Sequence, residues 1–165
     1  MSMQNLRDLF VHELKDLYSA EKQLLEALPK MAETANSAKL KTALTEHLQE
    51  TKVQFDRVHS LLQKLGENPT STKCNAMEGL IEEGADVISE DASPAVKDAA
   101  LIAAAQRVEH YEMAGYGTAR AHAMALGENH AAEVLQKTLE EESQANEALN
   151  AIALGEINEK ACAVC

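Results

Sequence analysis

Apolar side chains recur at three- and four-residue steps over long stretches of this chain. The first stretch comprises Leu6, Phe10, Leu14, Leu17, Leu24, Leu28 and Met31. This spacing places the residues on one face of a helix, which a packed protein buries. Glycine and proline number only 7 and 3 among 165 residues, too few for a turn-rich β-sandwich or barrel. The pattern predicts an all-α protein, and its length fits one domain.

The periodicity predicts four long helices in two hairpins. We expect them over 5–36, 37–66, 93–127 and 128–155. Pro29 removes one backbone hydrogen bond from the first helix, so a kink or a break is expected there. A long crossover joins the hairpins and contains a short helix over 76–89, capped by Asn75. Periodicity is absent after Gly155, so we assign 1–158 to the bundle and 159–165 to a flexible tail.

Charge and cysteine usage exclude several classes of protein. The chain carries 27 acidic and 15 basic residues, a formal charge of −12, which argues against binding to nucleic acid or anionic lipid. No apolar run approaches the roughly 20 residues of a membrane span, and no signal peptide is recognised, so a cytoplasmic protein is expected. Cys74, Cys162 and Cys165 are too few and too scattered for a disulfide framework.

Ionisable residues interrupt the apolar face of each long helix near its middle. These residues are Glu21, His47, Glu50, Glu109, Glu112 and Glu142. Buried carboxylates must be protonated, paired with bases or gathered around a cation. Any one of them could be a boundary residue, and His47 alone could be an ordinary core histidine. However, Glu50 follows Glu21 by 29 residues and Glu142 follows Glu112 by 30, and this repeated spacing favours a metal site formed by all six.

Five segments resemble the YciE/YciF family of ferritin-like bacterial stress proteins. They are LKDLYSAEKQLLEALPKMA (14–32), HLQET (47–51), CNAMEGLIEE (74–83), DAALIAAAQRVEHYE (98–112) and TLEEE (138–142). The resemblance extends over residues 3–158. It implies a ferritin-like four-helix bundle that forms a homodimer and is related in architecture to rubrerythrins and manganese catalases.

The resemblance also shows how this chain departs from other ferritin-like dimetal proteins. Those proteins use single glutamates on two helices and a Glu-x-x-His motif on each of the other two. Glu50 and Glu142 match the leading glutamates of the two motifs, but Val53 and Ala145 stand where the histidines belong. The remaining donors are rich in oxygen, which favours iron or manganese, and two ions are expected.

Two functions remain open at this stage. The first is redox chemistry on peroxide or dioxygen, as a di-iron or di-manganese oxidase, peroxidase or catalase-like enzyme. The second is a non-enzymatic, dimeric stress or interaction protein with a vestigial metal site. Iron storage is disfavoured because nothing in the sequence identifies the assembly surfaces that a cage needs.

Overall fold

The computed structural model describes residues 3–163, and every element in that range is helical. The four long helices are α1 (Leu6–Thr34), α2 (Ala38–Lys64), α4 (Pro94–Ala125) and α5 (Asn129–Ile152). The shorter elements are η1 (Pro69–Ser71), α3 (Asn75–Ser89), η2 (Ala153–Ile157) and α6 (Asn158–Cys162). The predicted all-α fold is confirmed. Within the described range, no helix is both long enough and apolar enough to cross a membrane.

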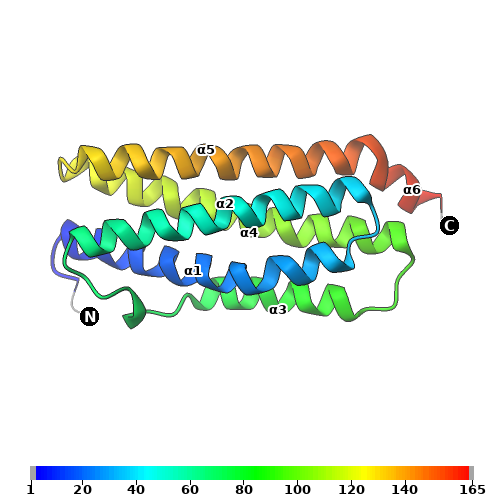
Figure 1. Ribbon diagram of the computed structural model, residues 1–165, viewed down its shortest axis with the longest axis horizontal. Coiled ribbons are helices and arrows are strands. Elements are labelled where there is room, and N and C mark those ends of the chain that lie inside the picture. The colour runs from blue at the N-terminus through cyan, green and yellow to red at the C-terminus, as the bar shows by residue number, and fades with distance from the viewer. Residues whose placement is uncertain (1–2, 164–165) are drawn as a thin grey trace.

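The long helices form two antiparallel hairpins that pack side by side (Figure 1). Helix α1 pairs with α2, and α4 pairs with α5; across the hairpins α1 packs on α4 and α2 on α5. The crossover between α2 and α4 carries α3, which packs on α1 and α4. This arrangement confirms the predicted ferritin-like bundle with one long connection.

Residues at the helix ends explain where the hairpins turn. The Asn5 side chain accepts a hydrogen bond of 2.9 Å from the backbone N–H of Asp8 and caps α1. Gly66 and Gly127 both have φ of 73°, a left-handed conformation that ends α2 and α4 and suits glycine. Pro94 begins α4 at the first helical position, as predicted.

The structure corrects the predicted cap of α3 and shows that α1 does not break at Pro29. Helix α1 runs through Pro29 without a break, because Leu28 and Met31 are buried on either side and their packing outweighs one lost hydrogen bond. The residue that caps α3 is Cys74, whose Sγ lies 3.4 Å from the backbone nitrogen of Met77, and Asn75 is already helical.

The C-terminal segment contains more helix than the periodicity predicted. After α5 the chain continues as the π-helical turn η2 and then α6, so 159–162 are helical, and the flexibility expected of 159–165 stays a prediction. Ala153 and Ile157 are buried in this segment, and their packing against α4 continues the helix past the exposed Gly155. Cys165 lies outside the described residues.

Two adjacent buried residues of α4, Lys97 and Asp98, form hydrogen bonds with the backbone of neighbouring segments. Asp98 accepts hydrogen bonds from the backbone N–H groups of Asn36 at 2.8 Å and Ser37 at 2.7 Å, which ties the α1–α2 turn to α4. Lys97 donates to the carbonyls of Val87 at 2.8 Å and Ile88 at 2.9 Å, at the C-terminal end of α3. Both charges are therefore satisfied by backbone groups and belong to the framework of the fold.

The bundle core consists of two apolar clusters with a polar band between them. One cluster includes Leu24, Leu44, Val108 and Leu149; the other includes Leu17, Val58, Tyr116 and Leu135. The side chains of the polar band are Glu21, His47, Thr51, Gln54, Glu109, Glu112, Thr138 and Glu142, all buried. Each long helix therefore changes from apolar to polar and back, and the polar residues meet near the middle of the bundle.

Candidate metal centre

Four side chains of the polar band form one compact group, which we call the central cluster. It consists of His47 on α2, Glu109 and Glu112 on α4, and Glu142 on α5. One ligand atom from each residue lies within 4.8 Å of the others. His47 is 5% exposed, Glu109 is 1% exposed, and the other two are fully buried. The two hairpins thus bring one imidazole and three carboxylates to a single point in the core.

The polar atoms of the central cluster do not satisfy one another. His47 Nε2 lies 3.4 Å from Glu109 Oε1 and 3.9 Å from Glu142 Oε2, and both distances exceed a normal N–H···O hydrogen bond. Among the described residues, both nitrogens of His47 and both carboxylate oxygens of Glu112 and Glu142 have no hydrogen-bond partner. Buried polar atoms are nearly always paired, so this group requires an explanation such as a bound ion.

The electrostatics of the central cluster favour neutral carboxyl groups when no cation is bound. Burial, together with repulsion from neighbouring carboxylates, raises the pKa of Glu112 and of Glu142 well above the usual range, and burial also raises the pKa of Glu109. Burial lowers the pKa of His47, but the charges of Glu109 and Glu50 outweigh it, and the net pKa is raised. The cluster therefore holds protons that a cation would displace.

Glu21 on α1 approaches the central cluster from the remaining long helix. Its side chain is fully buried, and its Oε1 accepts a hydrogen bond from the hydroxyl of Tyr116. Its Oε2 has no hydrogen-bond partner among the described residues. Burial raises the pKa of Glu21 to about 8, although the Tyr116 hydrogen bond and the charge of His47 act in the opposite direction. Glu21 is thus a further buried carboxylate, in addition to the three of the central cluster.

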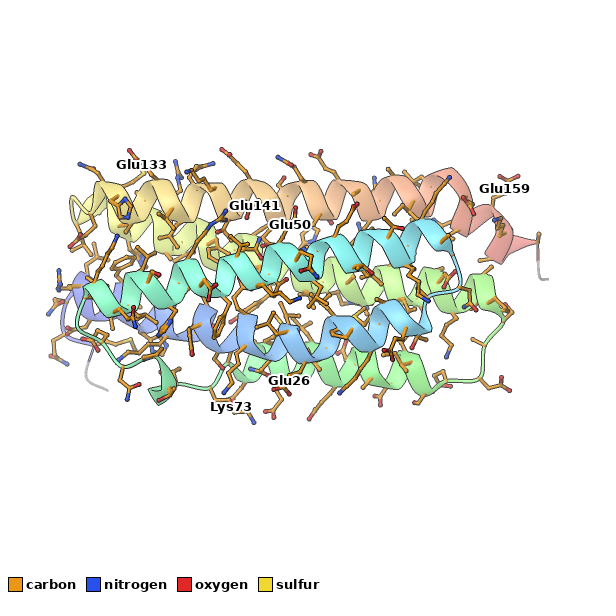
Figure 2. All side chains as sticks on the ribbon, in the orientation of Figure 1. Glu26, Glu50, Lys73, Glu133, Glu141 and Glu159 are labelled. Carbon is orange, nitrogen blue, oxygen red and sulfur yellow. The ribbon has the colours of Figure 1, made fainter. Side chains whose placement is uncertain are left out.

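The expectation that Glu50 faces the core is wrong. Its side chain is 47% exposed, and its Oε2 lies 3.6 Å from His47 Nδ1. Figure 2 shows it on the part of α2 that lies next to α5 in this view. A residue three positions after His47 is rotated by about 60° around the helix, and the buried face instead continues through Thr51 and Gln54. Glu50 therefore lies between the central cluster and solvent.

Sequence reasoning missed a basic residue beside this region, Arg57, which contacts Thr138 of the polar band. Arg57 donates to both carboxylate oxygens of Glu141, at 2.6 and 2.9 Å, and Gln54 donates to the same carboxylate. The only hint in the sequence is that Arg57 follows the buried Gln54 by one helical turn. Because Glu141 already pairs with the guanidinium, Arg57 does not neutralise the central cluster.

A further buried contact connects the crossover to α1 and α4. The thiol of Cys74 lies 3.0 Å from the hydroxyl of Tyr111, which donates a hydrogen bond to Asp16. Ser19 Oγ accepts from the backbone N–H of Cys74 at 2.9 Å. Burial raises the pKa of the Cys74 thiol. The residue is therefore an unreactive part of the packing where α3 begins.

The donor atoms of the central cluster fit a divalent transition metal. Carboxylate oxygens with a single imidazole suit iron or manganese, whereas thiolate-rich sites select zinc or copper(I). The buried unpartnered oxygens of Glu112 and Glu142 are available for a cation. Among the described residues, the ion pairs of the central cluster all involve His47, and none involves a lysine or an arginine. The residues present are thus compatible with the iron or manganese that the sequence predicted.

Comparison with known proteins identifies the family. A family model described as a domain of unknown function, DUF892, matches residues 5–162. The chain belongs to the DUF892 family. It is 46% identical over 162 residues to protein YciF of Escherichia coli (strain K12), and the match includes 98% of both sequences. The resemblance to YciF-like stress proteins is therefore confirmed.

Solved structures support the same assignment of this DUF892 chain. The crystal structure of the E. coli stress protein YciF matches with a TM-score of 0.90 and 45% identity, over 94% of this chain and 99% of that one. YcfI from Rhodopseudomonas palustris, for which a structural role has been suggested, matches with a TM-score of 0.88 and 44% identity, over 92% and 97%. A Xanthomonas campestris protein at 21% identity, with a TM-score of 0.73, shows the fold alone.

Proposed function

We propose that this member of the DUF892 family is a stress-response metalloprotein with an iron or manganese centre inside its bundle. One observation carries the proposal: four ligand atoms from two hairpins lie within 4.8 Å of one another and include buried oxygens without partners. A metal-free core would have to keep several of these carboxyl groups protonated, whereas a cation neutralises and orders them together.

The residues divide into two groups around the proposed ions. His47, Glu109, Glu112 and Glu142 would hold the first ion, because they already converge. Glu21 and Glu50 would serve a second ion: Glu21 presents a buried oxygen without a partner, and Glu50 adjoins His47. Tyr116 and Thr51 lie in the same band; Tyr116 orients Glu21 through its hydroxyl, and Thr51 donates to the His47 carbonyl at 2.9 Å.

The surrounding side chains suit redox chemistry on peroxide or dioxygen. Iron or manganese, when bound, supplies one-electron or two-electron redox steps that protein side chains lack. The two apolar clusters exclude water on both sides of the polar band. Whichever of His47 and Glu109 does not bind an ion can hold and release a proton, since the imidazole and the carboxylate adjoin one another.

A second candidate is a non-enzymatic stress protein that forms a homodimer in the cytoplasm. Val53 occupies the place of one motif histidine and is 49% exposed, so α2 supplies no ligand there. A structural role has been suggested for the relative YcfI. In this alternative the carboxyl groups of the central cluster stay protonated and no metal is needed. Sedimentation velocity of the purified chain tests the dimer.

Metal analysis separates the two candidates. The chain is purified without chelator, and its iron and manganese are measured alongside those of Glu112→Gln and Glu142→Gln, with Glu133→Gln, exposed on α5, as the matched control (Figure 2). The metal-centre proposal expects stoichiometric metal in the wild type and in Glu133→Gln, and loss of metal in both cluster variants. A metal-free wild type that also fails to bind added Mn²⁺ or Fe²⁺ would exclude it.

If metal is bound, consumption of hydrogen peroxide by the manganese and iron forms distinguishes a catalase-like activity from an oxidase-like one. The Glu142→Gln variant serves as the control for metal bound elsewhere on the acidic surface. Turnover that persists in this variant would place the chemistry outside the central cluster.

A further inference from the structure

A cavity of about 180 Å³ opens between α2 and α5 and leads to the central cluster. His47 and Glu109, two members of the cluster, line it. Glu46 and Glu50, both exposed on α2, line it toward solvent. Ala145 and Ala148 line it on the side of α5. We call it the α2–α5 cavity.

The position of this cavity follows from the packing of the bundle. Helix α3 lies against α1 and α4 and covers that face (Figure 1), whereas among the described elements none lies over the opposite face, between α2 and α5. Ala145 and Ala148 lie three residues apart, so their small side chains sit one above the other on α5. A gap therefore remains where larger residues would fill the space between the two helices.

The side chains that line the α2–α5 cavity toward solvent carry charges of one sign. Glu46 and Glu50 contribute carboxylates, and neither lysine nor arginine is among the residues that line it. Such an opening attracts cations, repels small anions and leaves neutral molecules unaffected. The cavity volume is enough for a few molecules of the size of water, which matches hydrated metal ions, peroxide and dioxygen.

Glu50 connects this opening with the buried imidazole. Its side chain is 47% exposed, while its Oε2 lies 3.6 Å from Nδ1 of His47, which is 5% exposed. One carboxylate thus contacts both solvent and a cluster residue. A flexible glutamate in such a place can bind an incoming cation at the surface and turn inward with it.

From these observations we infer that the α2–α5 cavity is the access route of the metal ion and of a small neutral oxidant, and that Glu46 and Glu50 draw divalent cations into it. This inference rests on the proposed metal centre. It also defines the substrate class: hydrogen peroxide and dioxygen enter, whereas anionic or bulky oxidants, including organic hydroperoxides with large substituents, are excluded.

The test measures the rate of metal uptake separately from affinity. Metal-free protein is mixed with Co²⁺, and uptake is followed by visible absorption in a stopped-flow instrument; a parallel titration gives the dissociation constant. Ala148→Leu and Ala145→Leu narrow the cavity, and Ala148 is exposed, so its variant is expected to fold. Ala151→Leu, an exposed alanine of α5 outside the cavity, is the matched control.

The expected result is slower uptake and slower release in the two leucine variants, with an unchanged dissociation constant, because a blocked path affects both rates alike. Glu46→Gln is expected to slow uptake by roughly tenfold at low salt and to lose the effect at high salt. Glu147→Gln, exposed on α5 and outside the cavity, is the charge control and should match the wild type.

The outcomes separate this inference from the proposed function. Stoichiometric binding with equal uptake rates in the wild type, Ala148→Leu and Glu46→Gln would overturn the access route and leave the metal centre intact. A wild type that binds neither Co²⁺ nor Mn²⁺ would overturn both. Slower uptake in the cavity variants, with normal rates in both controls, supports the access route.

Discussion

His47 Nε2 lies 3.4 Å from Glu109 Oε1, although the two residues belong to different hairpins of the bundle. Both side chains are almost fully buried, and burial disfavours the charged form of each. The nearby carboxylates nevertheless raise the net pKa of His47. The proton affinity of His47 therefore depends on the carboxyl groups that surround it.

We expect His47→Leu to destabilise the metal-free protein. Removing the imidazole leaves Glu109 without the basic group beside it, and an unsatisfied buried polar group costs about 1–3 kcal/mol of unfolding free energy. Chemical denaturation of chelator-treated protein at neutral pH measures this difference. In His47→Leu/Glu109→Leu the loss should be smaller than the sum of the single losses; simple additivity would show that the two side chains do not interact.

We expect Glu112→Gln to have opposite effects with and without metal. Both oxygens of Glu112 are buried without partners, and burial raises its pKa well above the usual range. An amide needs no proton on folding and can donate to neighbouring carboxylates, so the metal-free variant should be more stable by about 1–3 kcal/mol. Thermal unfolding of chelator-treated protein measures this gain; a less stable variant would indicate that Glu112 has a structural partner.

With added metal, the wild type should become more stable than Glu112→Gln. At a concentration of about 100 times its dissociation constant, a bound ion stabilises the folded state by about 2.7 kcal/mol, which corresponds to a rise in Tm of roughly 5–10 °C for a chain of this size. The rise is expected for the wild type and for the surface variant Glu133→Gln, and should be absent in Glu112→Gln. An equal rise in all three proteins would place the ion outside the central cluster.

Much of the bundle and of its polar band could be predicted because both depend on local periodicity. Glu21, Glu109, Glu112 and Glu142 interrupt apolar faces of regular helices, and all four are buried. Glu50 was misplaced for a related reason: it is rotated by about 60° from His47 around α2, on the side away from Thr51, and so lies at the edge of the buried face. The residues that continue that face, Thr51 and Gln54, are polar and gave no apolar signal.

Contacts between helices could not be predicted from periodicity. The pairing of Arg57 with Glu141 and of Tyr116 with Glu21 depends on how the two hairpins pack together. In the sequence, Asp98 is an ordinary acidic residue near the start of a helix, where its negative charge would interact favourably with the helix dipole. Its partners are backbone groups of the α1–α2 turn, distant in sequence. Such residues become recognisable only when the turn and the helix are seen together.

Asp98 therefore provides a test of the framework that is independent of metal. Asp98→Ala leaves the backbone N–H groups of Asn36 and Ser37 without their acceptor, and we expect a loss of about 2–3 kcal/mol in unfolding free energy. Asp91→Ala, at an exposed position before α4, is the control and should change stability little. Urea denaturation of both variants checks the difference, and the loss should be the same with and without metal.

The stability of the metal-free protein should fall as pH rises, because its buried carboxyl groups prefer to be neutral. The pKa of Glu21 is raised from 4.5 to about 8 by burial, and burial raises the pKa of Glu109, Glu112 and Glu142 as well. The folded state then binds more protons than the unfolded chain above pH 4.5, so this stabilisation is complete below pH 4.5 and is lost toward pH 8 and beyond. The raised pKa of His47 acts in the same direction.

Bound metal should change this pH dependence. Protons compete with the cation for the same carboxylates, so the stabilisation that metal adds should grow as pH rises, while the metal-free protein weakens. Denaturation curves recorded from about pH 5 to pH 8, with chelator or with Mn²⁺, should therefore diverge toward alkaline pH. In Glu112→Gln the two curves should stay together, with a shallower fall, because one of the titrating groups is gone. Parallel curves for the wild type would contradict the assignment of the central cluster as the metal centre.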